Sequence, residues 1–434
     1  MTLSPLDAAA RLAGKRGRVL LHSARDDDGL GRCSFATALP SATLIGRGSS
    51  LVRLDWQGRA VQRFSADPFD ATEQFLAEHG CTLSGASDAL PAPRVLGYFG
   101  YDLARVVESL PGGPTLGHDT PDLWLSAYDG VARWSPTGEC DLVGPDPAAL
   151  AAALAVIAPP SLAPRFGALV ADDDGAHHMA RVDRVRDYVA AGDVYQVNLA
   201  RRHVARITTP GDPLALYSAL VEVAPAPYGA VIEADGLTIV SGSPERFLAS
   251  VGDRIETRPI KGTRPPGRDG AAELAASPKD AAEHLMIVDL ERNDLGRVSE
   301  TGSVRVDELG YVVELPTLFH KVSRVSARPR RGLGYAELLR ATFPGGSITG
   351  APKVRAMQLI DELEPARRGP YCGAFGYFAP TGFDLALAIR IGVIKGNELR
   401  VHVGGGIVSD SDAAAELAET EVKLAGWRAA LGKL

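Results

Sequence analysis

The chain has 434 residues, of which 45% are hydrophobic and 23% charged, a size and composition typical of a globular protein with a large buried core. Its net charge of −7 argues against a general nucleic-acid binder, because such proteins present strongly basic surfaces. No apolar run is long enough to span a membrane, and the first residues lack the pattern of a secretory signal. The four cysteines are scattered without disulfide or metal-ligand spacing, so we expect a reduced protein in the cytoplasm, with no membrane or nucleic-acid partner.

The N-terminal part of the chain is predicted to consist of short strands and turns. Segments 18–23 and 94–104 have the compact, apolar or tyrosine-rich patterns of strands. An Ala- and Leu-rich segment at 145–164, flanked by prolines, predicts one helix. This helix either marks the boundary between an N-terminal subdomain, 1–165, and a catalytic region, 166–434, or lies on the surface of a single domain. We expect the two regions to be interwoven in one globular unit.

The signals become clearer after residue 176. The periodicity predicts a helix over 177–191 that ends at Gly192, a residue suited to a helix C-terminus. Ser277 and Pro278 predict the start of another helix, because serine caps helices and proline suits the first helical position. Further strands and helices are predicted at 194–203, 237–241, 246–251, 254–259, 277–293, 375–378, 385–394, 399–403 and 412–431. Since helices alternate with hairpins rather than with single strands, the pattern predicts an α+β fold with antiparallel sheets.

Two glycine-rich stretches are candidate binding segments. Residues 344–353 read Pro-Gly-Gly-Ser-Ile-Thr-Gly-Ala-Pro-Lys, and the residues between the last glycine and the lysine argue against a nucleotide phosphate loop. Free amides at the start of the following helix favour an anion, although a plain tight turn has the same sequence. The second run, Gly404, Gly405 and Gly406, predicts a bend or a close approach of the backbone to another group.

Carboxylates on two predicted helices form a candidate metal site. Glu416, Glu419 and Lys423 have the spacing of one helix face. Glu283 begins an almost wholly apolar stretch, where a carboxylate is expected to be paired or to bind a metal. Two glutamates from separate helices, completed by water and substrate oxygens, suit Mg²⁺, whereas ordinary solvated helix faces are the simpler alternative.

Three isolated basic side chains have both a catalytic and a structural interpretation. Lys261 ends a mostly apolar strand, where it is either a nucleophile or base, or a surface lysine in a turn. His320 lies in an apolar segment, where a histidine is more often a core residue than a catalyst. Arg390 lies within 385–394 and needs an anionic partner if it faces inward.

Together these segments resemble the chorismate-utilising enzymes. The resemblance covers about residues 176–430 in order, is weaker over 16–105, and implies the anthranilate-synthase-like fold of two packed, mostly antiparallel sheets with outer helices. The matching motifs are Gly-Asp-Val-Tyr-Gln-Val-Asn-Leu at 192–199, Ser-Pro-Glu-Arg-Phe at 243–247, Pro-Ile-Lys-Gly-Thr at 259–263, EHLMIVDLERNDLGRV at 283–298, GGSITGAPKVRAM at 345–357, 374–378, GGGIVSD at 404–410, and 416–423.

Two residues indicate a branch of that family. Lys261 resembles the aminodeoxychorismate synthases, whereas anthranilate synthases carry alanine at this position. Gln196 stands where the water-using isochorismate and salicylate synthases carry a lysine base, so it implies a member that uses ammonia. The alternatives are an anthranilate synthase component and, in a different class, a non-catalytic relative that binds tryptophan or chorismate.

The resemblance implies a Mg²⁺-dependent conversion of chorismate and ammonia to 4-amino-4-deoxychorismate, on the route to 4-aminobenzoate and folate. It assigns Lys261 as a covalent nucleophile, Glu245 as the acid that protonates the leaving 4-hydroxyl, and His320 as an active-site histidine. The implied metal ligands are Glu283, Glu416 and Glu419. The implied substrate contacts are Gln196, Gly346, Ser347, Tyr377, Arg390, Gly404, Gly405, Gly406 and Lys423.

Two further expectations concern other ligands and partners. In ammonia-using relatives the N-terminal region holds a tryptophan site, which here corresponds to Leu21, His22, Ser23, Pro227 and Tyr228. None of the cysteines stands in a Gly-x-Cys-x-Gly turn of a glutaminase. We therefore expect ammonia to come from a separate glutamine amidotransferase subunit or from free ammonium, and a separate lyase to make 4-aminobenzoate.

Overall fold

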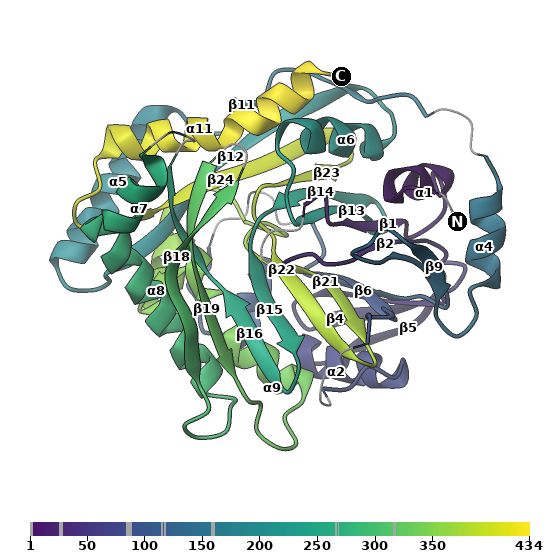
Figure 1. The fold of residues 1–434 in the computed structure, drawn as a ribbon. Helices are drawn as coiled ribbons and strands as arrows, with labels where there is room; N and C mark the ends of the chain where they lie inside the picture. Colours follow the sequence, from purple (N-terminus) through teal and green to yellow (C-terminus); the bar gives the residue numbers. More distant parts are fainter. Residues whose placement is uncertain are drawn as a thin grey trace.

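Two large antiparallel sheets form the frame of the molecule (Figure 1). A computed structural model of the chain describes residues 3–25, 29–83, 89–113, 116, 119–157, 161–264, 267, 269–315 and 318–434. In this part of the chain each sheet has 12 strands, and neighbouring strands pair antiparallel. The α+β architecture predicted from the alternation of helices and hairpins is confirmed.

The first sheet has the strand order β10-β12-β24-β23-β14-β13-β1-β2-β8-β9, with β11 and β20 also paired to β12. Its strands are β1 (Val19–His22), β2 (Ser34–Thr37), β8 (Val131–Trp134), β9 (Cys140–Val143), β10 (Arg165–Phe166), β11 (Val170–Ala171), β12 (Gln196–Thr209), β13 (Tyr228–Glu233), β14 (Leu237–Ser243), β20 (Gly350–Ala351), β23 (Ile391–Lys395) and β24 (Glu398–Ile407).

The second sheet has the order β17-β19-β16-β15-β22-β21-β6-β7-β3-β4-β5, with β18 paired to β19. Its strands are β3 (Ala42–Arg47), β4 (Ser50–Asp55), β5 (Ala60–Ser65), β6 (Val95–Phe99), β7 (Leu123–Ala127), β15 (Arg246–Val251), β16 (Arg254–Arg258), β17 (Ile260–Arg264), β18 (Arg305–Leu315), β19 (Leu318–Ala327), β21 (Ala374–Ala379) and β22 (Gly382–Leu387). Because β1 pairs with β13 and β6 with β21, strands from both sides of residue 165 share each sheet.

Helices cover the outer surfaces of the sheets, with α6 and α11 along the top of Figure 1. They are α1 (Pro5–Arg11), α2 (Pro68–Glu78), α3 (Ala104–Val107), α4 (Ala148–Ala155), α5 (Gly175–Ala190), α6 (Pro213–Val223), α7 (Gly270–Ala276), α8 (Pro278–Gly296), α9 (Tyr335–Thr342), α10 (Lys353–Leu363) and α11 (Ala413–Gly432). The expected cap of α8 is present: the Ser277 hydroxyl accepts the amide of Asp280. Helix α4 lies within the predicted segment 145–164, of which residues 158–160 are outside the described residues.

The predicted single strand at 385–394 is wrong, because this segment belongs to two sheets. Strand β22 ends at Leu387 in the second sheet, and β23 begins at Ile391 in the first. Between them, Arg390 adopts a φ of 50°, in the left-handed region that bulky residues rarely occupy. Both strands are buried and apolar, so no change of pattern marks the break. The crossing places Arg390 at the junction of the two sheets.

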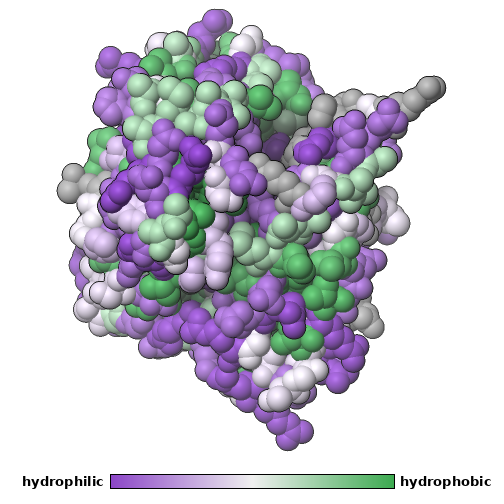
Figure 2. Space-filling view, turned by 90° about the vertical axis from the view of Figure 1, so that its left-hand side faces the viewer, coloured by the Kyte–Doolittle hydropathy of each residue, from purple (hydrophilic) through white to green (hydrophobic). Residues whose placement is uncertain are grey.

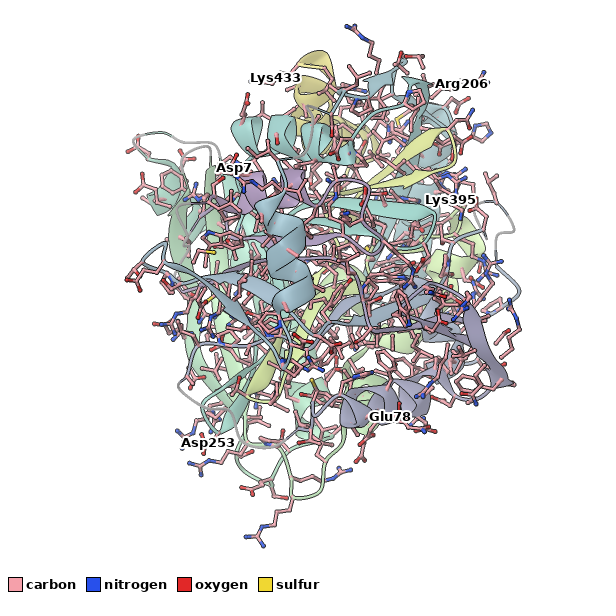
Figure 3. The ribbon with its side chains drawn as sticks, turned by 90° about the vertical axis from the view of Figure 1, so that its right-hand side faces the viewer. Asp7, Glu78, Arg206, Asp253, Lys395 and Lys433 are labelled. Atoms are coloured by element: carbon pink, nitrogen blue, oxygen red, sulfur yellow. The ribbon has the colours of Figure 1, made fainter. Side chains whose placement is uncertain are left out.

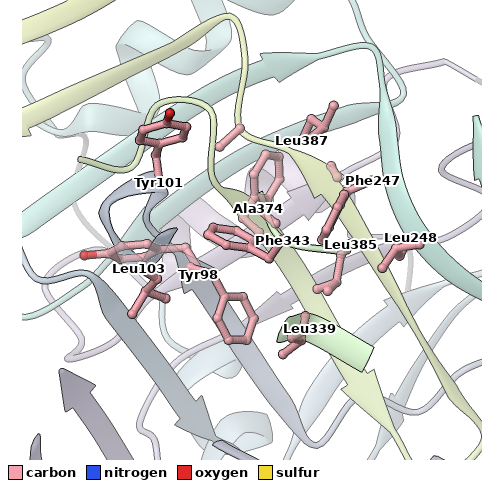
Figure 4. Close-up of a cluster of buried hydrophobic side chains, with 14 of the residues drawn as sticks. Tyr98, Tyr101, Leu103, Phe247, Leu248, Leu339, Phe343, Ala374, Leu385 and Leu387 are labelled. Atoms are coloured by element: carbon pink, nitrogen blue, oxygen red, sulfur yellow. The ribbon is translucent and has the colours of Figure 1, made fainter. Parts of the chain in front are cut away.

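Two apolar clusters hold the layers together. The larger one contains residues of both sheets, and Figure 4 shows the part of it around Phe247, Phe343 and Leu385. The smaller one packs α1, α4, α6 and α11 against the outer face of the first sheet, with Trp427 nearly fully buried. Burying a side chain of this size contributes about 1.5–3 kcal/mol. The sheets are therefore a rigid base for side chains that project from their edges.

The surface is predominantly polar. Figure 2 shows one face on which hydrophilic residues predominate and hydrophobic residues form separate groups. Charged side chains such as Glu78, Asp253 and Lys433 lie at the periphery (Figure 3). No helix in the described part of the chain is long and apolar enough to cross a membrane. The four cysteines are unpaired.

Candidate active site

The sequence-predicted site residues come mainly from α8, β17, β19, β24 and α11, which lie in the left half of Figure 1. In β17, Lys261 lies opposite Lys321 of β19, and Thr263 lies opposite His320. The Lys261 ammonium is 3.6 Å from Glu283 Oε1 of α8, and only 11% of its side chain is exposed. The structure therefore brings the predicted nucleophile to one of the predicted metal ligands.

Gly262 permits this close packing. Its φ is +78°, and a Cβ atom there would lie 2.8 Å from Leu274 Cδ1. A side chain at this position would push β17 away from the two helices beside it. The glycine after Lys261 is thus a requirement of the packing between β17 and α7.

Glu245 is a buried acid beside Lys261. Its side chain is nearly fully buried, and the amide of Ile260 donates to Oε1 at 3.4 Å. Burial raises the pKa of Glu245 to about 7, although the Ser347 hydrogen bond, the positive charge of Lys261 and the Ile260 amide each oppose the rise. Near neutral pH much of this carboxyl group keeps its proton. Such a group can act as a general acid.

Two of the three glycines of β24, Gly405 and Gly406, lie against the predicted metal ligands. A Cβ atom on Gly405 would lie 3.1 Å from Glu416 Oε2 and 3.6 Å from Glu419 Oε1. On Gly406 it would lie 3.2 Å from Glu283 Oε1. This close approach explains Gly405 and Gly406, since a side chain at either would fill the space that the carboxylates face. At Gly404 a Cβ atom would instead lie 2.5 Å from the carbonyl oxygen of Leu199.

Local contacts hold these carboxylates in place. Lys423 Nζ lies 2.7 Å from Glu419 Oε1 and donates to the Gly404 carbonyl oxygen at 2.6 Å. The Ser411 hydroxyl donates to Glu416 Oε1 at 2.6 Å. Lys423 therefore joins the last helix to the glycine run.

The donor set fits Mg²⁺ in its chemistry. Carboxylate oxygens are the ligands that this ion prefers, and it commonly takes one or two of them and keeps several waters. Among the residues that the structure describes, no three His, Cys, Asp or Glu side chains already stand in a metal-ligating arrangement. The glutamates thus surround the space beside Gly405 and Gly406 without closing on it.

Gln196 begins β12 beside this space. Its side chain is fully buried, and both its amide nitrogen and its oxygen lack a hydrogen-bond partner among the described groups. The side-chain oxygen of Asn198 also lacks one. Buried polar atoms without partners are costly, at about 1–3 kcal/mol each. Their presence at one place indicates a ligand or water that satisfies them.

His320 and Arg390 lie close enough to interact. Burial and the nearby charge of Arg390 lower the pKa of His320 to about 4, so its ring is neutral at neutral pH. Burial also lowers the pKa of Arg390. Among the described residues, no carboxylate lies within ion-pair distance of Arg390. An arginine in this setting is suited to bind an anionic ligand.

Tyr377, on the second sheet, lies at a cavity. This residue lines a separate cavity of about 550 Å³, to which neither Lys261 nor Arg390 contributes. Alternate residues of a strand face the same side, and Phe375, two positions before it, lines the same cavity. The Tyr377 ring packs 5.0 Å from the ring of Phe35. The substrate contact expected for Tyr377 stays a prediction.

The same cavity gathers all the residues of the expected tryptophan site. Its wall includes Leu21, His22, Ser23, Pro227 and Tyr228. Strands β1 and β13 pair directly, with His22 opposite Gly229, which brings these distant segments together. Polar and aromatic groups both line the space, as in many ligand-binding cavities.

A buried charged group behind the site was not predicted. Glu291 and Asp294 of α8 are both nearly fully buried, and Lys353, at the start of α10, pairs with Asp294. Lys353 also donates to the Thr342 carbonyl oxygen at 3.1 Å. The sequence feature that could have indicated this buried group is the pair Glu291 and Asp294, three positions apart in a predicted helix with many apolar residues.

Comparisons with known proteins give the family. A family model described as chorismate binding enzyme matches residues 40–428. Aminodeoxychorismate synthase component 1 of Klebsiella aerogenes is 41% identical over 431 residues, which cover 94% of this chain and 92% of the relative. Anthranilate synthase component 1 of Pseudomonas aeruginosa is 36% identical over 457 residues, which cover 96% of this chain and 90% of the relative.

A solved structure agrees with the fold. Anthranilate synthase component I from Streptococcus pneumoniae superposes with a TM-score of 0.77 at 29% identity, covering 92% of both chains. The expected anthranilate-synthase-like fold is thereby confirmed. The family match along most of the chain and the relatives that align over nearly its full length show that this protein belongs to the chorismate-binding enzymes.

Proposed function

We propose that this protein converts chorismate and ammonia to 4-amino-4-deoxychorismate. The observation that carries the proposal is the position of Lys261, which lies 3.6 Å from Glu283 and beside the buried acid Glu245. A nucleophilic amine next to a proton donor suits the replacement of a poor leaving group. The name of the Klebsiella aerogenes relative, aminodeoxychorismate synthase component 1, supports the same reaction.

The reaction needs a proton at the oxygen that leaves. Chorismate carries a 4-hydroxyl group, and Glu245 is the buried acid suited to donate a proton to it. The Lys261 ammonium first gives a proton to water, and its nitrogen then bonds to ring C2. The two ring double bonds each shift by one position, and the C4–oxygen bond breaks to release water; Lys261 regains a proton from water when it is released in the second step. The result is a substituted ring attached covalently to Lys261.

Ammonia completes the reaction. It bonds to C4, the double bonds shift back, and the C2–nitrogen bond breaks to release Lys261. The new ammonium group on C4 can return a proton to Glu245, which restores the acid. Two such substitutions are easier than one direct displacement, and the enolpyruvyl group stays on the ring.

We assign the two carboxylates of chorismate to different parts of the site. Arg390 and the backbone amides of residues 404–406 hold the enolpyruvyl carboxylate, and this is supported by the absence of a described carboxylate partner for Arg390. Glu283, Glu416 and Glu419 hold Mg²⁺, whose bound charge would withdraw electrons from the ring through its carboxylate. The glutamate oxygens around Gly405 and Gly406 support this placement.

Ammonia is supplied by a glutamine amidotransferase subunit. The designation "component 1" of the relatives supports a second component. Gln196, with an unpartnered buried amide, is suited to hold a small polar nucleophile. We place the reaction in the cytoplasm, which the four unpaired cysteines support.

Product analysis tests the reaction. The purified protein is incubated with chorismate, Mg²⁺ and an ammonium salt, and products are separated and identified by mass spectrometry. We expect 4-amino-4-deoxychorismate, which retains the enolpyruvyl group. Incubation without ammonia should leave a covalent adduct on Lys261. Formation of anthranilate without added lyase would overturn the assignment.

Anthranilate synthesis is the second candidate. It is favoured by the 36% identity to the Pseudomonas aeruginosa anthranilate synthase component 1 over 96% of this chain. In that reaction pyruvate is eliminated, and the product is fluorescent, so one assay separates the two candidates. A complete lack of turnover with Mg²⁺ and ammonium would instead support a non-catalytic relative.

We also propose that the cavity beside Tyr228 binds tryptophan. All five residues of the expected site line its 550 Å³ volume. Titration calorimetry with tryptophan tests this directly. Unchanged heats up to millimolar concentrations would contradict it.

A further inference from the structure

A short turn connects the buried acid Glu291 to the active site. The turn comprises residues 345–348, and the amide of Gly346 donates to Glu291 Oε1 at 3.0 Å. A Cβ atom on Gly346 would lie 2.7 Å from Leu290 Cδ2 and 3.0 Å from Glu291 Oε1. The turn therefore rests directly on helix α8, and Leu290 and Glu291 lie beneath Gly346.

The next residue of the turn reaches the proposed proton donor. The hydroxyl of Ser347 lies beside the carboxyl group of Glu245 and lowers its pKa, against the effect of burial. Ser347 is itself buried, and its carbonyl oxygen accepts the side-chain amide of Asn198 at 3.4 Å. The contacts thus run from Glu291 through the Gly346 amide and Ser347 to Glu245.

Behind the turn, the two acids Glu291 and Asp294 lie near one lysine, Lys353. Asp294 is paired with Lys353, and Glu291 lies close to both. Burial, followed by the neighbouring charge of Asp294, raises the pKa of Glu291 to about 8. A protonated carboxyl group still accepts the Gly346 amide through its carbonyl oxygen. Protonated Glu291 therefore holds the turn in place and adds no negative charge to that of Asp294.

We propose that Glu291 is a positioning residue for the chorismate reaction. By holding the Gly346 amide, it fixes the turn that directs the Ser347 hydroxyl to Glu245. This inference rests on the proposed function, because it assigns Glu291 an effect on the step in which Glu245 donates its proton. Small displacements of a catalytic group cost up to about 100-fold in rate, so a hydrogen bond that fixes the turn beside Glu245 can be important.

Three variants and a control test the role in the full-length protein. Glu291→Ala should lower kcat by about 10- to 100-fold, because the Ser347 hydroxyl is then no longer held toward Glu245. Glu291→Gln, which keeps the acceptor oxygen, should restore most of the lost kcat. If Glu291 acts through Ser347, the double variant Glu291→Ala/Ser347→Ala should be no slower than Ser347→Ala alone. Asp289→Asn, at an exposed position of the same helix, is the matched control.

A second measurement makes the test independent of turnover. Amide hydrogen exchange of the peptide that spans 345–350 should be faster in Glu291→Ala than in the wild type and near the wild-type rate in Glu291→Gln. Equal loss of kcat in the Ala and Gln variants, additive effects with Ser347, or unchanged exchange in Glu291→Ala would each overturn the positioning role. An inactive wild-type protein would overturn the proposed function, and the exchange experiment would still decide whether Glu291 holds the turn.

Discussion

The Lys261 site and the cavity beside Tyr228 differ in how their polar groups are satisfied. In the cavity wall, Arg246 lies 2.9 Å from Asp384 and 2.6 Å from Glu256, so its charge is matched within the protein. In the Lys261 site, the Gln196 amide has no described partner, and no described carboxylate pairs with Arg390.

The two environments are one residue apart in the chain, because Glu245 directly precedes β15 and Arg246 is its first residue. Glu245 faces Ser347 and Lys261, whereas Arg246 lines the cavity. Adjacent residues of a strand point to opposite sides, which explains the change. Polar groups that satisfy each other stabilise the fold, while buried groups without partners indicate where a ligand belongs. We therefore expect substitutions around Glu245 to affect turnover, and substitutions around Arg246 to affect the free energy of unfolding.

Lys261→Ala should have the largest effect. Removal of the nucleophile is expected to lower kcat by about 10³-fold or more, because the covalent bond to the ring is formed by this amine. Steady-state assays with chorismate, Mg²⁺ and ammonium measure this loss. Lys395→Ala, at the end of β23, is the matched control and should leave kcat unchanged. Activity of Lys261→Ala above a tenth of the wild-type value would exclude the nucleophilic role.

Glu245→Gln should lower kcat by about 10²- to 10³-fold, because the amide cannot donate a proton to the leaving hydroxyl. The wild-type kcat should fall as pH rises through about 7, where Glu245 loses its proton. This alkaline limb should disappear in the variant. A pH profile that is the same in both proteins would assign the proton to another group.

Glu245 should also make stability depend on pH. Burial raises its pKa from 4.5 in the unfolded chain to about 7 in the folded protein. Between these values the folded protein binds more protons, so its free energy of unfolding should decrease as pH rises. Chemical denaturation at pH 5 and pH 8 measures the difference, which should be smaller in Glu245→Gln. An equal difference in both proteins would contradict the assigned shift.

Arg390→Ala should weaken substrate binding. Loss of a charged hydrogen bond to a carboxylate costs about 1.5–3 kcal/mol, which corresponds to an increase in KM of about 10- to 100-fold. Binding of chorismate in the absence of ammonia provides a second readout. A normal KM in this variant would place the enolpyruvyl carboxylate elsewhere.

Asp384→Asn should give the smallest effect on chorismate turnover. It removes one carboxylate from Arg246 in the cavity wall and leaves the other, so we expect a loss of about 1–3 kcal/mol in the free energy of unfolding. Denaturant titration measures this loss. A decrease in kcat as large as that of Glu245→Gln would show that the two sides of β15 are not independent.

Local patterns in the sequence determined several elements and faces. Ser277 and Pro278 start α8, and the left-handed Gly192 follows α5, because a helix end depends on a few neighbouring residues. The spacing of Glu416, Glu419 and Lys423 sets them on one helical face, and two of them form an ion pair. These features follow from the helical repeat and need no information about distant residues.

The tertiary structure alone decided which faces meet. Glu283 on α8 and Glu416 on α11 converge because β24 brings Gly405 and Gly406 between them. The break of the segment 385–394 into two sheets, the turning of Tyr377 into the cavity and the support of the Gly346 turn by Glu291 all depend on contacts between residues far apart in sequence. Strand alternation defines two faces but does not say what lies opposite each one. The sequence by itself therefore determined the chemistry and much of the local structure, while long-range pairing and packing decided how the site is assembled and supported.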